Sequence, residues 1–231
     1  TPIARMSQVA RSAAQLLDSL GDNGTSIGVA WGATLTEVSR HLPKRPLEGV
    51  SVVQLNGAGN AHHSGIPYLG TLLGRMVSAY DAYMIHFPVP AFFDFADTKA
   101  AMWRERSIQA TLQVQSRVDV AVFGIGAFGG AIPSHVYSGG YFDVTEQRLL
   151  REQGVVGDIC TVLLREDGSW NDLEINRRAS GPSPQELSRI PRRICVASGT
   201  HRAAALRGAL RTGAITDLVL DEKLARAVME K

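Results

Sequence analysis

The sequence has few cysteines, and those it has are isolated. Cys160 and Cys195 each lie inside an apolar run, and neither has a second cysteine at metal-ligand spacing. This pattern excludes a disulfide framework or a zinc site and favours two buried, reduced thiols. No apolar run approaches the ~18 residues of a membrane span, and Thr1–Arg5 opens a helix instead of a signal peptide. These absences predict a cytoplasmic protein.

An excess of one charge is also missing. The chain has 24 basic and 22 acidic residues, distributed along its length, for a net charge of +2. Duplex DNA and anionic membranes require a concentrated basic surface. We therefore expect this chain to bind neither strongly by itself.

Apolar runs and helical patterns alternate along the chain. Predicted strands lie at residues 26–31, 50–55, 83–87, 118–125, 159–164, 193–197 and 217–220. Predicted helices lie at residues 34–42, 67–79, 98–118, 145–153, 183–190, 202–211 and 221–230. The alternation indicates an α/β, Rossmann-like fold with a largely parallel sheet and helices on both faces. Ligands of such sheets bind beyond the carboxyl ends of the strands.

An amphipathic helix is predicted before the first strand. Its apolar residues recur at helical spacing from Ile3 to Leu20, and the turn Gly21–Gly24 ends it. The helix docks either on this domain or on a second subunit. We divide the chain into a linker or oligomerisation helix at residues 1–22 and a ligand-binding domain at residues 23–231.

The first strand runs into the small residues Gly32, Ala33 and Thr34 at the start of a helix. Small side chains let a ligand approach free backbone N–H groups, and the positive end of the helix favours phosphate or carboxylate. The alternative is a capping box between Thr34 and Glu37, which would satisfy the same donors internally.

Gly124–Gly129 matches the dinucleotide motif GxGxxG after a strand, but its context differs from that of a Rossmann motif. Glycines and a proline follow instead of a helix, and no strand ends in an acidic residue ~20 positions on. We therefore predict no NAD and no other cofactor. The loop instead folds over a ligand with Ser134 and His135, and Asn56 and Gly57 form a second polar turn. For both the glycine loop and the Asn56–Gly57 turn, the alternative to ligand binding is a simple flexible turn.

His62 and His63 are adjacent and have no matching cluster of ligands, so we predict no metal site.

Six segments in order resemble the effector-binding domain of SorC-family bacterial transcription regulators, from about Gly28 to the C-terminus. They are Gly28–Leu35, Asp119–Gly126, Gly154–Ile159, Asn176–Gly181, Cys195–Gly199 and Ala204–Glu222. The resemblance implies a fold similar to glucosamine-6-phosphate deaminase, ribose-5-phosphate isomerase and CoA-transferases, adapted from catalysis to sensing.

The resemblance also implies a function and partners. Such domains bind a phosphorylated sugar or related carbohydrate metabolite, form homodimers or homotetramers, and modulate operator binding by an N-terminal helix-turn-helix. We expect that DNA-binding part to be absent from this chain and the first helix to be the remaining linker.

Carried over residue by residue, the family's pattern predicts an effector site. Its phosphate turn falls on Gly32, Ala33 and Thr34, and its polar turn on Asn56 and Gly57. Ser134 or His135 comes from the glycine loop, Asp158 accepts sugar hydroxyls, and Arg202 stands where members usually have lysine. Arginine holds phosphate bidentately but does not form a Schiff base. The alternatives are a structural cap for Asp158 and a helix-surface position for Arg202.

Two competing functions remain open. A sugar-phosphate isomerase or deaminase shares the implied fold, but needs an acid and a base over C1 and C2 of the sugar. Asp119 and Asp158 do not form a recognisable catalytic set. A protein-interaction module leaves the glycine loops unexplained. The sequence favours a non-catalytic sensor.

Overall fold

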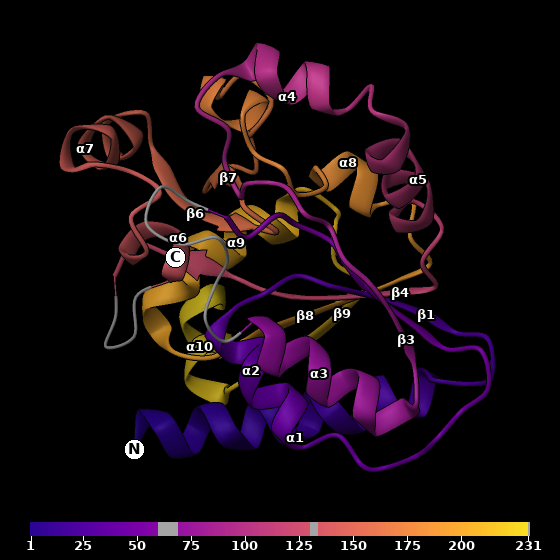
Figure 1. The fold of residues 1–231 in the computed structure, drawn as a ribbon. Helices are drawn as coiled ribbons and strands as arrows, with labels where there is room; N and C mark the ends of the chain where they lie inside the picture. The colour runs from indigo at the N-terminus through magenta and orange to yellow at the C-terminus, as the bar shows by residue number, and fades with distance from the viewer. Residues whose placement is uncertain (60–68, 130–133, 231) are drawn as a thin grey trace.

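A computed structural model describes residues 1–59, 69–129 and 134–230 (Figure 1). Its centre is a six-stranded sheet of order β3-β2-β1-β4-β8-β9, in which all neighbours pair in parallel. The strands are β1 (Ser26–Val29), β2 (Ser51–Gln54), β3 (Tyr83–Ile85), β4 (Val120–Gly124), β8 (Arg192–Ala197) and β9 (Asp217–Leu220). The order reverses between β1 and β4, and such a switch point opens a crevice at the carboxyl ends of the strands.

Both faces of this sheet are covered, as the sequence predicts. Helices α1 (Pro2–Leu20), α2 (Ala33–Arg40) and α3 (Leu69–Tyr80) lie over one face, and α5 (Arg106–Gln115), α8 (Pro184–Leu187) and α9 (Ala203–Arg211) lie over the other (Figure 1). Successive strand residues alternate between two cores. Val122 packs in the core on the side of α1, α2 and α3, and Phe123 packs in the core on the side of α8 and α9. A strand buried on both faces is apolar throughout, which explains the continuous apolar runs of the sequence.

A second, antiparallel sheet stands above the carboxyl ends. It contains β5 (Gly126–Ala127), β6 (Val155–Ile159) and β7 (Val162–Arg165). The predicted single strand at 159–164 is therefore wrong. Cys160 and Thr161 have φ of 50° and 71° and form a two-residue turn between β6 and β7. Such turns normally carry Asn-Gly, and this pair gives no turn signal in the sequence.

The predicted helix at 98–118 is also wrong in extent. It is broken into α4 (Ala96–Met102) and α5, with Trp103 at the break. The Trp103 ring packs edge-on against Phe87 and Phe93, each 5.7 Å away between centroids, and the chain turns around this contact. The remaining elements are α6 (His135–Ser138), α7 (Val144–Glu152), η1 (Glu174–Arg177), η2 (Thr200–Arg202) and α10 (Glu222–Met229).

Helix α1 packs as part of the domain. Val9, Ala10, Ala13, Ala14 and Leu17 are buried in the same core as the strand residues of β1. Its predicted role in linking or oligomerisation stays a prediction. No helix in residues 1–59, 69–129 and 134–230 is long and apolar enough to cross a membrane.

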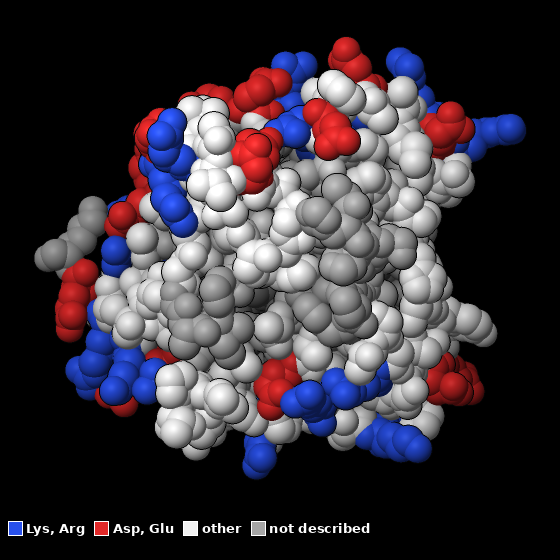
Figure 2. Space-filling model, turned by 60° about the vertical axis from the view of Figure 1, so that its left-hand side comes forward, with Lys and Arg blue, Asp and Glu red and all other residues white. Residues whose placement is uncertain are grey.

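The distribution of charge agrees with the low net charge. On the face shown in Figure 2, Lys and Arg side chains are interspersed with Asp and Glu, and most lie toward its periphery. Among the described residues of this face no continuous basic stripe is visible, which fits the expectation of weak nucleic-acid binding by this chain alone.

Two glycines provide a test of the packing. A Cβ added at Gly157 in β6 would lie 2.1 Å from the Gly126 carbonyl oxygen and 2.5 Å from Ala205 Cβ. We expect Gly157→Ala to lower the free energy of unfolding by about 3 kcal/mol in urea titrations. Gly74→Ala in α3, where no atom lies within 4 Å, is the control and should raise it by roughly 0.5–1 kcal/mol. Equal stabilities of the two variants would contradict this close approach of β5, β6 and α9.

Candidate ligand-binding site

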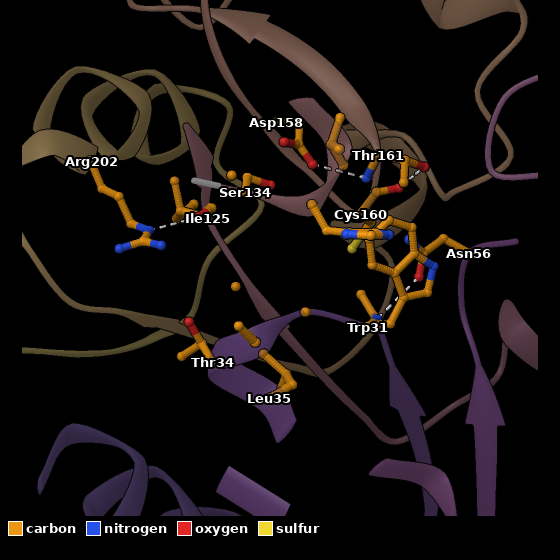
Figure 3. A pocket seen from close by; sticks show the side chains of 17 residues that line it. Trp31, Thr34, Leu35, Asn56, Ile125, Ser134, Asp158, Cys160, Thr161 and Arg202 are labelled. Atoms are coloured by element: carbon orange, nitrogen blue, oxygen red, sulfur yellow. Dashed lines mark hydrogen bonds between the residues drawn. The ribbon is translucent and has the colours of Figure 1, made fainter. Parts of the chain in front are cut away.

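A pocket opens at the switch point between β1 and β4, where the topology predicts one (Figure 3). It holds about 550 Å³ of empty space, counting its open mouth. Its walls come from the start of α2, the ends of β1 and β4, the β6–β7 turn and η2. Eight of the nine predicted site residues line it: Gly32, Ala33, Thr34, Asn56, Ser134, His135, Asp158 and Arg202.

The start of α2 forms one wall of the pocket. Gly32 is its N-cap and provides no side-chain cap, and the first intrahelical bond runs from Thr36 N to Gly32 O. The backbone N–H groups before Thr36 therefore lack helical acceptors, and they carry the positive end of the helix. The alternative capping box is wrong, because the Glu37 carboxylate instead accepts from Arg40 Nη1 at 3.1 Å and contacts His41 Nε2 at 3.3 Å.

Arg202 approaches the same end of the pocket from η2 (Figure 3). Its side chain donates from Nε to the Ile125 carbonyl oxygen at 3.1 Å and from Nη1 to the Ser198 carbonyl oxygen. Nη2 has no hydrogen bond within the described part of the chain. Burial lowers the pKa of Arg202, while the charges of Asp158 and Asp221 oppose that shift. Arg202 is 9% exposed, so its alternative position on a helix surface is wrong.

Asp158 lies on β6 and presents a buried carboxylate. Oδ2 accepts from Thr161 N at 3.3 Å, and Oδ1 has no hydrogen-bond partner among the residues described. The Tyr137 hydroxyl lies beside the carboxylate and favours its charged form, although the two are outside hydrogen-bond geometry. Burial raises the pKa of Asp158 to about 6, against the opposing effects of Tyr137, Thr161 and Arg202. Asp158 thus caps the hairpin turn with one oxygen and leaves the other available.

A glycine makes room for this carboxylate. A Cβ at Gly126 would lie 1.8 Å from Asp158 Oδ1 and 2.9 Å from Ser134 Oγ. Gly126 belongs to β5, which pairs with β6, so a strand and not a helix continues the GxGxxG segment. This strand departs from the strand-to-helix context that a Rossmann dinucleotide motif requires.

Asn56 and Gly57 follow β2 and have different roles. Asn56 is 1% exposed; its Oδ1 accepts from Trp31 N at 3.4 Å, and its buried Nδ2 has no partner in the described structure. Gly57 does not line the pocket. Its N–H donates to Ser180 Oγ and its carbonyl accepts from Trp31 Nε1, while a Cβ there would lie 2.2 Å from the Pro90 carbonyl oxygen. Gly57 therefore supports the pocket wall from behind.

Ser134 and His135 begin α6 above the pocket. Ser134 is the N-cap of this short helix, and the His135 ring packs edge-on against Trp31 and Tyr141 at 5.9 and 5.8 Å between centroids. Trp31 and Tyr141 are themselves stacked at 6.0 Å. These aromatic side chains connect the segment after β5 to β1.

Several pocket residues were not predicted as site residues. Trp31, which follows β1, forms the wall beside Asn56 (Figure 3). Cys160 and Thr161 line the pocket because they form the hairpin turn, and neither is a residue type that typically marks such a turn. Both cysteines are buried and free, as predicted. The pairing of β6 with β5 and β7 brings the Cys160–Thr161 turn to the pocket, and this pairing cannot be read from the sequence.

The acid/base pair required by the enzyme hypothesis does not assemble. Asp119 precedes β4 and its Oδ2 accepts from Ser26 N and Oγ at 2.8 and 2.7 Å, at the amino-terminal edge of the sheet. Asp158 lies beyond the opposite, carboxyl edge. His62 and His63 fall outside the described residues, within which no group of three potential metal ligands occurs.

The fold and the pocket together define an α/β domain with a pocket of polar and apolar side chains at its topological switch point, where ligands of such sheets bind. The model of the Sugar-bind family, described as a sugar-binding domain, matches residues 3–230. The chain belongs to this family, the sugar-binding domain of SorC-type transcription regulators, and the resemblance seen in the sequence is confirmed.

Curated relatives carry the names of bacterial regulators. The chain is 28% identical over 221 residues to the deoxyribonucleoside regulator of Bacillus subtilis (strain 168), covering 96% of this chain and 69% of that protein. It is 30% identical over 219 residues to the transcriptional regulator LsrR of Enterobacter sp. (strain 638), covering 94% and 65%. The chain thus spans about two thirds of the length of these relatives.

Solved structures have the same fold. A domain of a "possible sugar-binding transcriptional regulator" from Arthrobacter aurescens TC1 superposes with a TM-score of 0.91 at 47% identity, covering 99% of this chain and 87% of that chain. The full-length sorbitol operon regulator SorC from Klebsiella pneumoniae gives a TM-score of 0.87 at 22% identity, covering 97% and 73%, and at this identity shows the fold alone.

Proposed function

We propose that this pocket binds a phosphorylated sugar or a closely related carbohydrate metabolite and that the chain is the effector-sensing part of a transcription regulator. The observation that carries the proposal is the combination of unlike polar groups in one pocket. The start of α2 and Arg202 supply positive charge, and Asp158 Oδ1 and Asn56 Nδ2 are buried without hydrogen-bond partners in the described residues. Buried polar atoms without partners are costly, so a ligand that pairs with both gains affinity.

The positive end suits a phosphate. Its oxygens accept from the free N–H groups at the start of α2, from the Thr34 hydroxyl and from Arg202 Nη2. No group in the described residues hydrogen-bonds to the Thr34 hydroxyl, which is 8% exposed and faces the pocket (Figure 3). An arginine here remains charged and holds the anion electrostatically.

Two further polar groups suit sugar hydroxyls. A hydroxyl is both a donor and an acceptor, and Asp158 Oδ1 is an acceptor while Asn56 Nδ2 is a donor. The Trp31 ring, which lies beside Asn56 (Figure 3), offers an apolar surface to the C–H groups of a sugar.

Regulation by such a ligand requires different affinities for two states of the whole protein. We propose that the effector changes the packing of a homodimer or homotetramer and thereby operator binding by the DNA-binding region of the regulator. In this proposal the domain senses without catalysing, in the cytoplasm, where transcription takes place. The regulator names of the relatives support this role.

A thermal-shift screen against sugar phosphates, free sugars and polyols tests the function. A ligand at 100 times its Kd stabilises the folded chain by about 2.7 kcal/mol, which for a domain of this size raises Tm by about 5–10 °C. We expect this shift with a phosphorylated sugar and a smaller one with the unphosphorylated parent. Inorganic phosphate is the control for the anion alone. Shifts with free sugars or polyols only would contradict the phosphate assignment, and no shift with any carbohydrate would contradict effector binding.

A further inference from the structure

A second cavity lies away from the pocket described above, between α4, α5 and α8 in the upper part of Figure 1. It holds about 750 Å³ of empty space, counting its mouth, and shares no lining residue with the first pocket. Its apolar walls include Trp103, Leu112 and Ile190. Apolar walls with a few polar groups are the composition of a small-molecule site.

Lys99 brings a positive charge to this cavity, which the carboxylate of Glu186 also lines. Its Nζ lies 5.0 Å from the centroid of the Trp103 ring, and in the described residues it forms no ion pair. Burial lowers the pKa of Lys99, and the Glu186 charge opposes that shift. Arg189 lines the same cavity, also without an ion pair to the residues described.

Gln115 provides a buried acceptor at the cavity. The residue is 6% exposed, and its Nε2 is engaged by the carbonyl oxygens of Gln54 at 2.7 Å and Leu55 at 3.3 Å. These bonds fix the orientation of the amide and leave Oε1 without a hydrogen bond from any described group. A ligand in this cavity therefore meets two cations and one carboxylate, a flat aromatic ring and an unpaired acceptor.

From this combination we propose that the second cavity is a separate binding site for a small organic anion with a planar or apolar body and a hydrogen-bond donor. The anionic group is held by Lys99 and Arg189, the body lies against Trp103, and the donor bonds Gln115 Oε1. This inference uses none of the residues of the proposed effector pocket and does not depend on its function.

The two cavities are connected through the segment Ser180–Gly181. Gly181 N donates to Thr161 Oγ1 at 3.3 Å, and a Cβ at Gly181 would lie 1.6 Å from the Cys160 carbonyl oxygen. Ser180 and Gly181 line the second cavity, whereas Cys160 and Thr161 line the first. The walls of the two cavities are thus in direct contact through this segment.

The chain contains natural reporters for a test by two-dimensional NMR. Its three tryptophan indole N–H signals separate the sites, because Trp31 lines the first pocket and Trp103 the second. The probe is 4-hydroxybenzoate, which has a carboxylate, a planar body and a hydroxyl donor. We expect saturable movement of the Trp103 signal, assigned with Trp103→Phe, and little movement of Trp31.

Matched variants identify the group that holds the anion. Lys99→Met keeps the apolar stem and should weaken binding at least tenfold, whereas Lys99→Arg and the exposed-site control Lys223→Met should bind like the native chain. Neutral 4-hydroxybenzamide should bind at least tenfold more weakly than the acid. Absence of a saturable Trp103 shift, equal binding by Lys99→Met, or equal binding of the amide would each overturn the proposal.

Discussion

Arg202→Gln should weaken binding of a phosphorylated sugar by about 10- to 150-fold and leave binding of the unphosphorylated parent nearly unchanged. A hydrogen bond to a charged group contributes about 1.5–3 kcal/mol, which sets this range. We expect this difference between ligands because, in the proposed function, Arg202 Nη2 and Thr34 bind the phosphate, whereas Asp158 and Asn56 bind the sugar. Titration calorimetry with each ligand measures both affinities.

Controls separate this effect from a loss of structure. Arg202 also donates to the Ile125 and Ser198 carbonyl oxygens, so the variant is expected to lose some stability, which urea unfolding determines independently. Thr34→Val replaces the hydroxyl by a methyl group of nearly equal shape. It should also weaken binding of the phosphorylated sugar more than binding of the unphosphorylated parent, with a smaller loss of affinity than Arg202→Gln. Arg11→Gln on the exposed surface of α1 should behave like the native chain. An equal loss of affinity for both ligands would contradict a phosphate role for Arg202.

Asp158→Asn should stabilise the empty protein and weaken its ligand binding. Burial raises the pKa of Asp158 from 3.8 to about 6, so the ionised carboxylate costs the fold as much as about 3 kcal/mol above pH 6. The folded state binds the proton more tightly than the unfolded state, and this contribution to stability is therefore present near pH 4 and lost as pH rises through 6. Asparagine cannot ionise and avoids the cost.

The pH dependence of the difference between the two chains isolates this group. Between pH 4.5 and pH 7.5, urea unfolding should show the stability of Asp158→Asn rising relative to that of the native chain by about 2 kcal/mol. At pH 7.5 the variant should bind the effector about 5- to 30-fold more weakly, because a neutral acceptor replaces a charged one. A stability difference that is constant with pH would show that Asp158 does not titrate in this window.

The position of the site followed from the sequence because a parallel sheet fixes where its strands end. Thr34 and Asn56 each come after a predicted strand, and strands that run in parallel bring such residues to one edge. Gly57 shows the limit of this argument. Gly57, one residue after Asn56, packs tightly against the Pro90 carbonyl. Pro90 belongs to a loop that is distant in the sequence, so this contact could not be predicted from the strand pattern.

The hairpin that carries Asp158 was the main feature beyond the reach of the sequence. Cys160 and Thr161 take left-handed backbone angles without the glycine or asparagine that usually marks such a turn. Tertiary contacts maintain it: Asp158 Oδ2 accepts from Thr161 N, and Gly181 packs against the Cys160 carbonyl. Backbone strain of this kind accumulates at ligand sites, where the surrounding structure holds it in place.

A crystal structure of this chain with the sugar phosphate that gives the largest thermal shift tests the central claim most directly. The account predicts one ligand in the pocket between β1 and β4, with its phosphate on Thr34, the start of α2 and Arg202, and a hydroxyl donating to Asp158 Oδ1. A ligand bound elsewhere, or bound here with its phosphate at Asp158, would contradict it.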